Sequence, residues 1–213
     1  MTDGVTHGSV LSVHVGRPRH VTAGPREVST AIWKQPVQHR VAVRGVNLDG
    51  DDQADRTVHG GPDKAVYAYA SEEIRLWQDE LDRDLGEAPF GQNLTTEGVE
   101  VSGAVVGERW RIGTALLEVA QPRVPCYKLA IRIGEASFVK RFAAASRPGA
   151  YLRIVEEGEL GAGDSVEVVS RPDHGITVRL VFDAMLNDPA LLPLAAQARE
   201  LPPDLRAWLR RRG

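Results

Sequence analysis

The chain has very little cysteine: Cys126 is the only one among 213 residues. A single thiol cannot form an intramolecular disulfide, a Cys-x-x-Cys redox pair or an all-thiolate zinc site. No apolar run approaches the roughly 20 residues that a membrane-spanning helix needs. The first ten residues lack the basic start and the apolar core of a secretory signal. We therefore expect a cytoplasmic protein whose one thiol is a candidate functional group.

The chain also lacks an excess of positive charge. It has 26 basic and 29 acidic residues, which gives a formal net charge of -3. This balance argues against a protein that binds nucleic acid along an extended basic surface. Sequence motifs for a phosphate-binding loop, a Rossmann turn (GxGxxG), a hydrolase elbow (GxSxG) and an HExxH zinc site are all absent. Ordinary NTPase and dinucleotide chemistry are thereby excluded. A Ser-His-Asp hydrolase would lack its usual elbow, and a zinc site is hard to build from six scattered histidines.

The first two thirds of the chain are predicted to form short β-strands separated by glycine and proline. In Ser9–Val15 apolar and polar residues alternate, which is typical of a half-buried strand. Further strands are predicted at Ala31–Trp33, Val41–Val43, Lys64–Ala70, Glu108–Ile112, Ala115–Ala120, Tyr151–Val155 and Ser165–Val169. Many short strands at this spacing favour a barrel or sandwich over repeated βαβ units. We assign residues 9–170 to this mainly β domain.

Two helices are predicted within the β domain. Ser71 is a candidate N-cap for the first, in which Ile74, Trp77 and Leu81 form one apolar stripe. The second is predicted at Ser137–Ala145.

Residues 176–210 are predicted to form a small appendage of three short helices. Thr177 is a candidate cap for the first helix, and Asp188 followed by Pro189 is typical of the start of the second. The third opens at Pro202 and ends in three arginines, which suit the negative end of a helix. About 40 residues are marginal for independent folding, so we expect the appendage to dock on the β domain or on a partner.

Two polar, glycine-containing segments lie beside predicted strands. In the first, Gly50–Asp55 is followed by His59–Lys64, where two glycines after a histidine make a tight turn that a ligand can approach closely. The second, Phe90–Gly98, offers amide and hydroxyl groups, including those of Asn93 and Thr95. Each segment taken alone is also typical of an ordinary turn.

A third segment, Gln121–Lys128, surrounds the thiol. Two prolines stiffen the chain there, and Arg123 and Lys128 favour the thiolate if they lie near Cys126. The alternative is an inert buried cysteine, but the prolines and cations favour a functional thiol. Cations near the three segments are candidates for a phosphate site, although Arg109 and Arg111 suit ordinary surface positions best; they are Arg44, Lys64, Arg109, Arg111 and Arg123.

In this order the segments resemble the MOSC-domain family, named after the C-terminal domain of molybdenum-cofactor sulfurase. The matching pieces are GDDQAD, VHGGPDKAVYAYA, the helix with Trp77, PFGQNLTTEGV, GERWRIGTALLEVAQPRVPCYKL and the three-helix tail. The resemblance runs from about Ser9 to Trp208. It is closer to the stand-alone bacterial branch, the YiiM-like proteins with a C-terminal three-helix (3-alpha) domain. Gln92 and Tyr127 depart from the family pattern, in which Glu and Trp are more common.

The resemblance implies a β-barrel related to the small barrel of pyruvate kinase. It implies a molybdenum cofactor, in which a molybdopterin dithiolene holds the metal and Cys126 adds a thiolate. The implied activity is reduction of N-hydroxylated compounds, including nucleobases such as 6-hydroxylaminopurine, in detoxification. Pyridoxal phosphate binding is a further family property. Since the dithiolene supplies two sulfurs, one cysteine suffices for such a metal.

Within this resemblance each candidate residue receives a role. Cys126 is the metal ligand and a catalytic residue, and His59 is the candidate proton donor because its ordinary pKa is near neutral. Cofactor-binding candidates are His59, Lys64, Asn93, Thr95, Arg123 and Cys126. One cysteine cannot hold an iron–sulfur cluster, so the reaction implies an external electron-donor reductase. A homodimer is compatible with the sequence.

Two other functions stay open at this point. The protein is alternatively a carrier that holds the cofactor, or a persulfide on Cys126, without turnover of its own. It is otherwise a metal-free cysteine enzyme, such as a sulfurtransferase, with Cys126 as the nucleophile.

Overall fold

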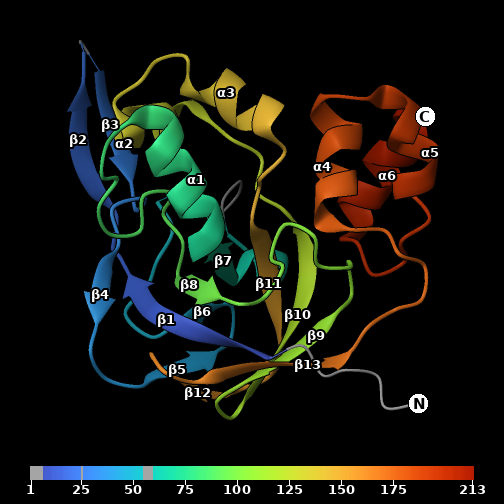
Figure 1. Ribbon diagram of the computed structural model, residues 1–213, viewed down its shortest axis with the longest axis horizontal. Coiled ribbons are helices and arrows are strands. Elements are labelled where there is room, and N and C mark those ends of the chain that lie inside the picture. The colour runs from blue at the N-terminus through green and yellow to red at the C-terminus, as the bar shows by residue number, and fades with distance from the viewer. Residues whose placement is uncertain (1–6, 25, 55–59) are drawn as a thin grey trace.

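The computed structural model describes residues 7–24, 26–54 and 60–213. Its centre is a closed β-barrel in which seven strands follow the order β13-β9-β10-β11-β7-β8-β1 and β1 pairs with β13 (Figure 1). The strands are β1 (His7–Val15), β7 (Val66–Ala70), β8 (Leu94–Glu97), β9 (Arg109–Ile112), β10 (Ala115–Pro122), β11 (Ala150–Glu156) and β13 (Ser165–Ser170). Only β7 and β8 pair in parallel within this ring. The predicted mainly β fold with helices is confirmed.

The remaining described strands lie outside the ring. β4 (Gln35–Val37) extends β1, and β2 (Arg19–Ala23) pairs with β3 (Arg26–Thr30) in a hairpin. A small sheet joins β12 (Gly158–Leu160), β5 (Val41–Arg44) and β6 (Asn47–Leu48). The strand predicted at Ala31–Trp33 is wrong. There the Thr30 hydroxyl accepts a hydrogen bond from the Ile32 amide at 3.2 Å, and this local turn ends β3.

Three helices lie near one end of the barrel, together with the β2–β3 hairpin (Figure 1). They are α1 (Ser71–Leu81), α2 (Tyr127–Ile133) and α3 (Phe138–Ala145), of which α2 was not predicted. Ser71 is not the cap of α1, because the extended Ala70 precedes the helix and β7 runs directly into it. Trp77 of α1 is fully buried against Phe138 and Phe142 of α3, and this aromatic cluster holds α1 and α3 together.

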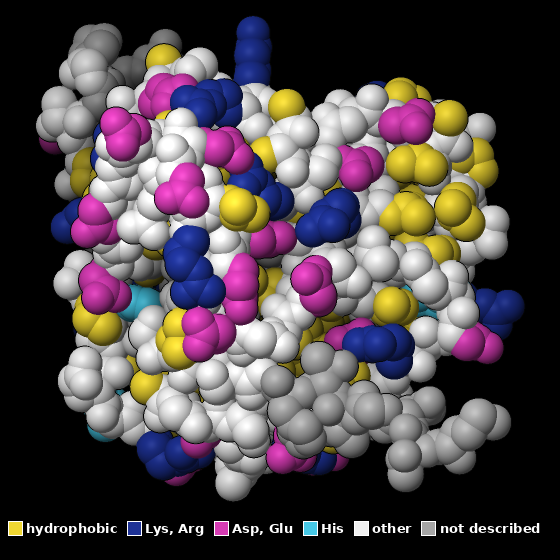
Figure 2. Space-filling model, viewed as in Figure 1, with side chains coloured by type: hydrophobic (Ala, Val, Ile, Leu, Met, Phe, Trp, Pro, Cys, Tyr) yellow, Lys and Arg dark blue, Asp and Glu magenta, His cyan; other side chains and the backbone are white. Residues whose placement is uncertain are grey.

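The C-terminal residues form α4 (Val178–Leu186), the 3₁₀ turn η2 (Pro189–Leu191), α5 (Leu192–Ala195) and α6 (Pro203–Arg212). The predicted caps are confirmed: Thr177 accepts a hydrogen bond from the Leu180 amide at 3.1 Å, and Asp188 accepts one from the Ala190 amide at 3.0 Å. Figure 2 shows apolar side chains gathered on the surface over these helices. Two large apolar side chains of the helices are exposed, Leu186 of α4 and Leu194 of α5.

One continuous apolar core joins the barrel to these C-terminal helices. Buried residues of the barrel strands, such as Trp110 and Leu117, belong to the same cluster as Val181 of α4 and Leu209 of α6. Backbone hydrogen bonds add to this contact, since the Val178 amide donates to the Ala104 carbonyl at 2.9 Å. The boundaries at residues 170 and 176 stay a prediction, but the appendage does dock on the barrel. No described helix has the length and hydrophobicity to cross a membrane.

Candidate functional site

A cavity of about 100 Å³ lies where several loops meet the ends of the strands. Its walls come from the segment after β3, the segment 51–54, the turn before β8 and the segment that joins β10 to α2. Lys64, Tyr67 of β7 and Tyr151 of β11 complete the wall. The cavity therefore collects residues that are far apart in sequence, including all three segments selected from the sequence.

Cys126 lines this cavity as a partly buried free thiol. The residues before Pro122 and Pro125 are held extended, because the proline ring disfavours helical backbone in the residue that precedes it. Cys126 itself is extended, and α2 begins at the next residue. The Cys126 carbonyl accepts the Leu129 amide at 2.9 Å, which fixes the backbone that carries the thiol. The prolines and the helix thus set the position of this side chain.

Arg123 lies three residues before the thiol and is buried in the same wall. Its guanidinium carbon lies 5.7 Å from the centre of the Tyr67 ring and 5.6 Å from that of Phe142, so two aromatic faces support the cation. One terminal nitrogen, Nη1, is buried and has no hydrogen-bond partner among the described residues. A buried guanidinium nitrogen without an acceptor is costly, so this atom indicates a site for an anionic group.

Lys34 and Asp51 form a buried ion pair that also belongs to the lining. The Lys34 ammonium donates to Asp51 Oδ1, which also accepts the Gly16 amide at 2.8 Å. Burial lowers the pKa of Lys34, although the neighbouring Asp51 and Asp52 carboxylates act in the opposite direction. Burial likewise lowers the pKa of Lys64 and raises that of Tyr151. The cavity therefore places ionisable groups where water solvates them poorly.

Charge in the lining is predominantly positive. Four cations, Lys34, Lys64, Arg123 and Lys128, face two carboxylates, those of Asp51 and Asp52. The other candidate cations from the sequence lie elsewhere: Arg44 pairs with Asp49, Arg109 with Glu118 at 2.8 Å, and Arg111 with Glu156 at 2.7 Å. Of the five candidate cations, the cavity brings together Lys64 and Arg123.

Asn93 lines the cavity, but the protein already occupies its amide. Asn93 Oδ1 accepts the Tyr67 amide at 3.0 Å, and Nδ2 donates to the His14 carbonyl at 3.1 Å and to Asp51 Oδ2 at 2.9 Å. The geometry makes Asn93 a residue that positions the wall. Its predicted direct contact with a cofactor stays a prediction.

Thr95 lies on β8 outside the cavity lining. Its hydroxyl accepts a hydrogen bond from Gln92 Nε2 at 3.2 Å, while Gln92 Oε1 accepts the Phe90 amide at 3.1 Å. Gln92, which stands where the family more often has Glu, is therefore buried in a structural contact. His59 lies outside the described residues, and its role as proton donor stays a prediction.

Among the lining residues with a titratable side chain, sequence reasoning missed three: Lys34, Tyr67 and Tyr151. The two tyrosines lie in strands whose sequence pattern is that of ordinary core strands. No sequence signal therefore distinguishes these tyrosines from core residues. Lys34 did offer a signal, because lysine is rare in this chain and Lys34 follows the apolar run Ala31–Trp33.

The described residues contain no group of three or more His, Cys, Asp or Glu side chains that could hold a metal ion. A protein-only metal site of the usual kind is therefore absent from that part of the chain. A metal at Cys126 has to arrive with most of its own ligands.

Comparison with known proteins decides the family. The sequence matches the MOSC domain over residues 55–167. This chain belongs to the MOSC-domain family. Within the family, it is 38% identical to the Bacillus subtilis (strain 168) protein YflK, itself uncharacterised, over 80% of this chain and 77% of that protein. It is 34% identical to Escherichia coli (strain K12) YiiM over 76% of this chain and 72% of YiiM.

MOSC proteins of known structure share the architecture. The crystal structure of YiiM from Geobacillus stearothermophilus superposes with a TM-score of 0.78 at 28% identity, over 96% of this chain and 98% of that one. A Gibberella moniliformis (strain M3125 / FGSC 7600) protein named as a reductase is 30% identical over 92% of this chain, which spans only 35% of that protein. These relatives support the YiiM-like branch and an oxidoreductase-like role.

Proposed function

We propose that this MOSC protein is a molybdenum-cofactor-dependent reductase of N-hydroxylated compounds, such as the nucleobase 6-hydroxylaminopurine. The observation that carries the proposal is the cavity itself, which unites the only thiol of the chain with four cations. The reductase named among the relatives supports the same class of reaction.

The residues of the cavity fit an anionic, sulfur-bound cofactor. The Nη1 atom of Arg123, which has no partner among the described residues, needs an acceptor, and a phosphate oxygen is the kind of acceptor that a guanidinium prefers. Lys64 lies in the same lining and adds positive charge. A molybdopterin phosphate would provide the acceptor for Arg123 and would lie in the positive field to which Lys64 contributes, and the cavity residue Cys126 would provide the thiolate.

When bound, the molybdenum cofactor supplies the two-electron redox chemistry that no amino-acid side chain provides. The residues of the chain would position the cofactor and the substrate, balance the charge of the cofactor and supply protons. Prolines and α2 hold Cys126 at a fixed place, and its thiolate would be the protein group that holds the metal. Arg123, supported by the Tyr67 and Phe142 rings, would hold the anionic end of the cofactor. Partial burial of the cavity strengthens these electrostatic contacts.

Electrons have to come from outside this chain. One cysteine cannot hold an iron–sulfur cluster, and the sequence lacks a dinucleotide-binding motif. The proposal therefore includes an external electron-donor reductase, with a small-molecule substrate and no nucleic-acid polymer as partner. It places the enzyme in the cytoplasm. A homodimer is compatible with the apolar surface over the C-terminal helices.

The test is the molybdenum content per chain of the wild type and of Cys126→Ser, both made in a host that synthesises molybdopterin. We expect close to one molybdenum per wild-type chain, and reduction of 6-hydroxylaminopurine by the wild type with a chemically reduced dye as donor. Cys126→Ser should keep its fold, measured by circular dichroism, and lose turnover. Full activity of a metal-loaded Cys126→Ser protein would refute ligation by this thiol.

Two other outcomes would point to the alternative functions. Bound cofactor without turnover would favour a carrier of the cofactor or of sulfur. Absence of both molybdenum and pterin, with rapid stoichiometric alkylation of Cys126, would favour a metal-free cysteine enzyme.

A further inference from the structure

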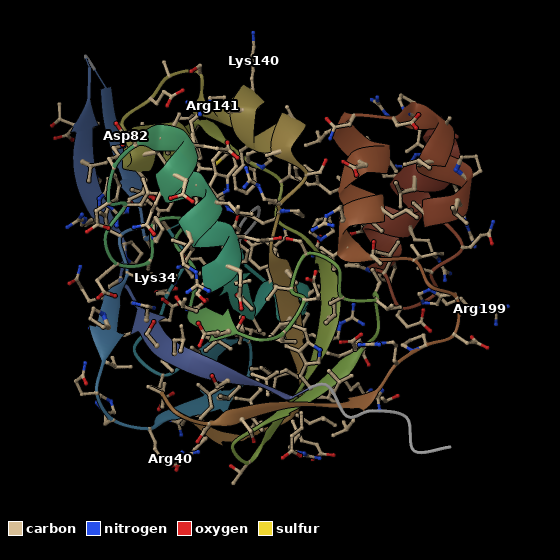
Figure 3. The ribbon with its side chains drawn as sticks, viewed as in Figure 1. Lys34, Arg40, Asp82, Lys140, Arg141 and Arg199 are labelled. Carbon is tan, nitrogen blue, oxygen red and sulfur yellow. The ribbon has the colours of Figure 1, made fainter. Side chains whose placement is uncertain are left out.

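Lysine is scarce in this chain, and its distribution is uneven. Only four of the 26 basic residues are lysines: Lys34, Lys64, Lys128 and Lys140. Three of these four line the candidate cavity. The fourth, Lys140, projects from α3 into solvent, whereas Lys34 lies within the body of the molecule near β1 and β4 (Figure 3). A chain that uses arginine almost everywhere else thus places lysine at its candidate site.

The two side chains differ in what they can do. Arginine stays protonated at any physiological pH, so it binds anions but does not transfer a proton. A lysine ammonium does release its proton once burial weakens the charged form. The presence of lysine in the cavity therefore favours proton transfer over simple charge compensation.

Lys34 has the environment that such a role requires. It is 7% exposed, lines the same cavity as Cys126, and has Asp51 as its one hydrogen-bond acceptor in the described part of the chain. Two of its three N–H bonds remain available to a bound molecule. Burial also lowers the pKa of this ammonium, which makes it a stronger acid.

Asp51 holds Lys34 in a fixed position. Its two carboxylate oxygens accept the Gly16 amide at 2.8 Å and Asn93 Nδ2 at 2.9 Å, in addition to Lys34. The carboxylate is thus anchored to the segment after β1 and to the turn before β8. Asp51 is a positioning residue for the ammonium, in the way that an anchored carboxylate orients a catalytic base elsewhere.

We propose that Lys34 is the general acid that protonates the departing oxygen of the N-hydroxylated substrate, with Asp51 as its positioning residue. This inference rests on the proposed reductase function and assigns a step within it. In the step the N–O bond breaks, and the oxygen leaves as water with the Lys34 proton. The nitrogen gains two electrons from the external donor and one proton from solvent, and solvent then reprotonates the Lys34 amine.

Other groups around the cavity affect this proton and enter its test. Asp51 and Asp52 favour the charged ammonium. The rest of the lining contributes the cations of Lys64, Arg123 and Lys128, the Cys126 thiol and the phenols of Tyr67 and Tyr151. His59, which is outside the described residues, is the competing candidate for proton donor.

The first test compares Lys34→Arg with Lys140→Arg, its matched exposed control. Lys34→Arg keeps a positive charge opposite Asp51 but cannot deliver a proton at neutral pH. We expect unchanged molybdenum content. The kcat should fall by a factor of at least about 100, since general acid catalysis typically contributes that much. Lys140→Arg should match the wild type. If Lys34→Arg does not fold, Lys34→Met serves instead.

The second test needs no cofactor. We would label the four lysines with ¹³C at Cε and follow their nuclear magnetic resonance signals against pH in the apoprotein, with Lys34→Arg identifying the signal of Lys34. The Lys34 signal should titrate at lower pH than in the urea-unfolded protein. In the loaded wild type, kcat should fall with rising pH over the range in which Lys34 loses its proton, and residual Lys34→Arg activity should lack that decline.

The outcomes separate this proposal from the function on which it rests. Full kcat in a loaded Lys34→Arg protein, or a Lys34 signal that titrates as in the unfolded chain, would overturn the role of Lys34 alone. Loss of turnover in His59→Gln together with normal turnover in Lys34→Arg would transfer the role to His59. A wild type without molybdenum and without turnover would refute the reductase function, and the role of Lys34 with it.

Discussion

Asn93 Nδ2 donates a hydrogen bond to Asp51 Oδ2 at 2.9 Å, although 42 residues separate the two in sequence. The same amide also pairs with the Tyr67 amide and the His14 carbonyl. Asn93 therefore ties β1, β7 and the segment 51–54 to one point beneath the cavity. Long-range polar contacts of this kind give the cavity its shape.

Asn93→Ala should unfold at a lower urea concentration than the wild type. The substitution leaves the Tyr67 amide, the His14 carbonyl and one oxygen of Asp51 without this partner. Each orphaned buried group costs roughly 1–3 kcal/mol, so with three such groups we expect a loss of at least about 3 kcal/mol in the free energy of unfolding. Asn187→Ala, which removes an exposed amide with hydrogen bonds of its own, is the control and should cost less. Equal losses in the two variants would contradict the positioning role.

Arg123→Met should weaken cofactor binding without lowering the stability of the folded apoprotein. Because one Arg123 nitrogen is buried without an acceptor, methionine of similar length should leave the apoprotein as stable as the wild type or more stable. The variant should nevertheless carry much less molybdopterin, measured by pterin fluorescence after extraction. Arg153→Met provides the contrast, since Arg153 pairs with Asp63 at 2.8 Å and with Glu118 at 2.9 Å. That control should lose stability, and an Arg123→Met protein that unfolds just as easily would make Arg123 a structural residue.

The sequence predicts the fold class better than the local elements around the site. The alternating run Ser9–Val15 correctly predicts strand β1 but not which of its side chains are buried. The register shifts between Val10 and Ser12, and Leu11 is 44% exposed whereas His14 is buried. The β2–β3 hairpin was missed because polar and charged residues occupy both of its faces, which leaves no period of two. The helix α2 was missed because it has seven residues and follows two prolines.

Within the site, the sequence predicts the stiff backbone around Cys126. It does not predict which residues that are distant in sequence pair with one another. The segment around Cys126 reveals itself through its prolines and cations. The partnership of Lys34 with Asp51 depends on barrel closure, and no spacing rule connects residues that meet in this way. Burial of Lys34 is likewise a property of the assembled cavity.

Glu73 should make stability depend on pH in a defined direction. It is a largely buried carboxyl that accepts a hydrogen bond from Ser102 at 2.8 Å, and burial raises its pKa above the ordinary 4.5. The folded state then binds a proton more readily than the unfolded state. The resulting stabilisation is fully present below pH 4.5 and is lost as pH rises through the folded pKa.

Glu73→Gln removes this dependence while keeping a similar shape. Relative to the variant, the wild type should therefore gain stability as pH falls from 7 towards 4.5, measured by urea unfolding at several pH values. A difference in stability that stays constant, or that moves in the opposite direction, would show that the pKa of Glu73 is not raised. Glu135→Gln, which changes a partly exposed carboxyl that accepts a hydrogen bond from Ser137, tests whether the effect is specific, because the pKa of Glu135 is lowered instead.

The C-terminal helices should unfold together with the barrel. Leu209 of α6 is fully buried in the core cluster that includes Trp110 and Leu117 of the barrel. Leu209→Ala should therefore cost about 2–5 kcal/mol and lower the temperature of a single calorimetric transition. Leu186→Ala, at a position that is 42% exposed, should have a much smaller effect. If Leu209→Ala instead produced an early transition and left the main one in place, the helices would be an independent folding unit. In that case the shared core would contribute little to the stability of the barrel.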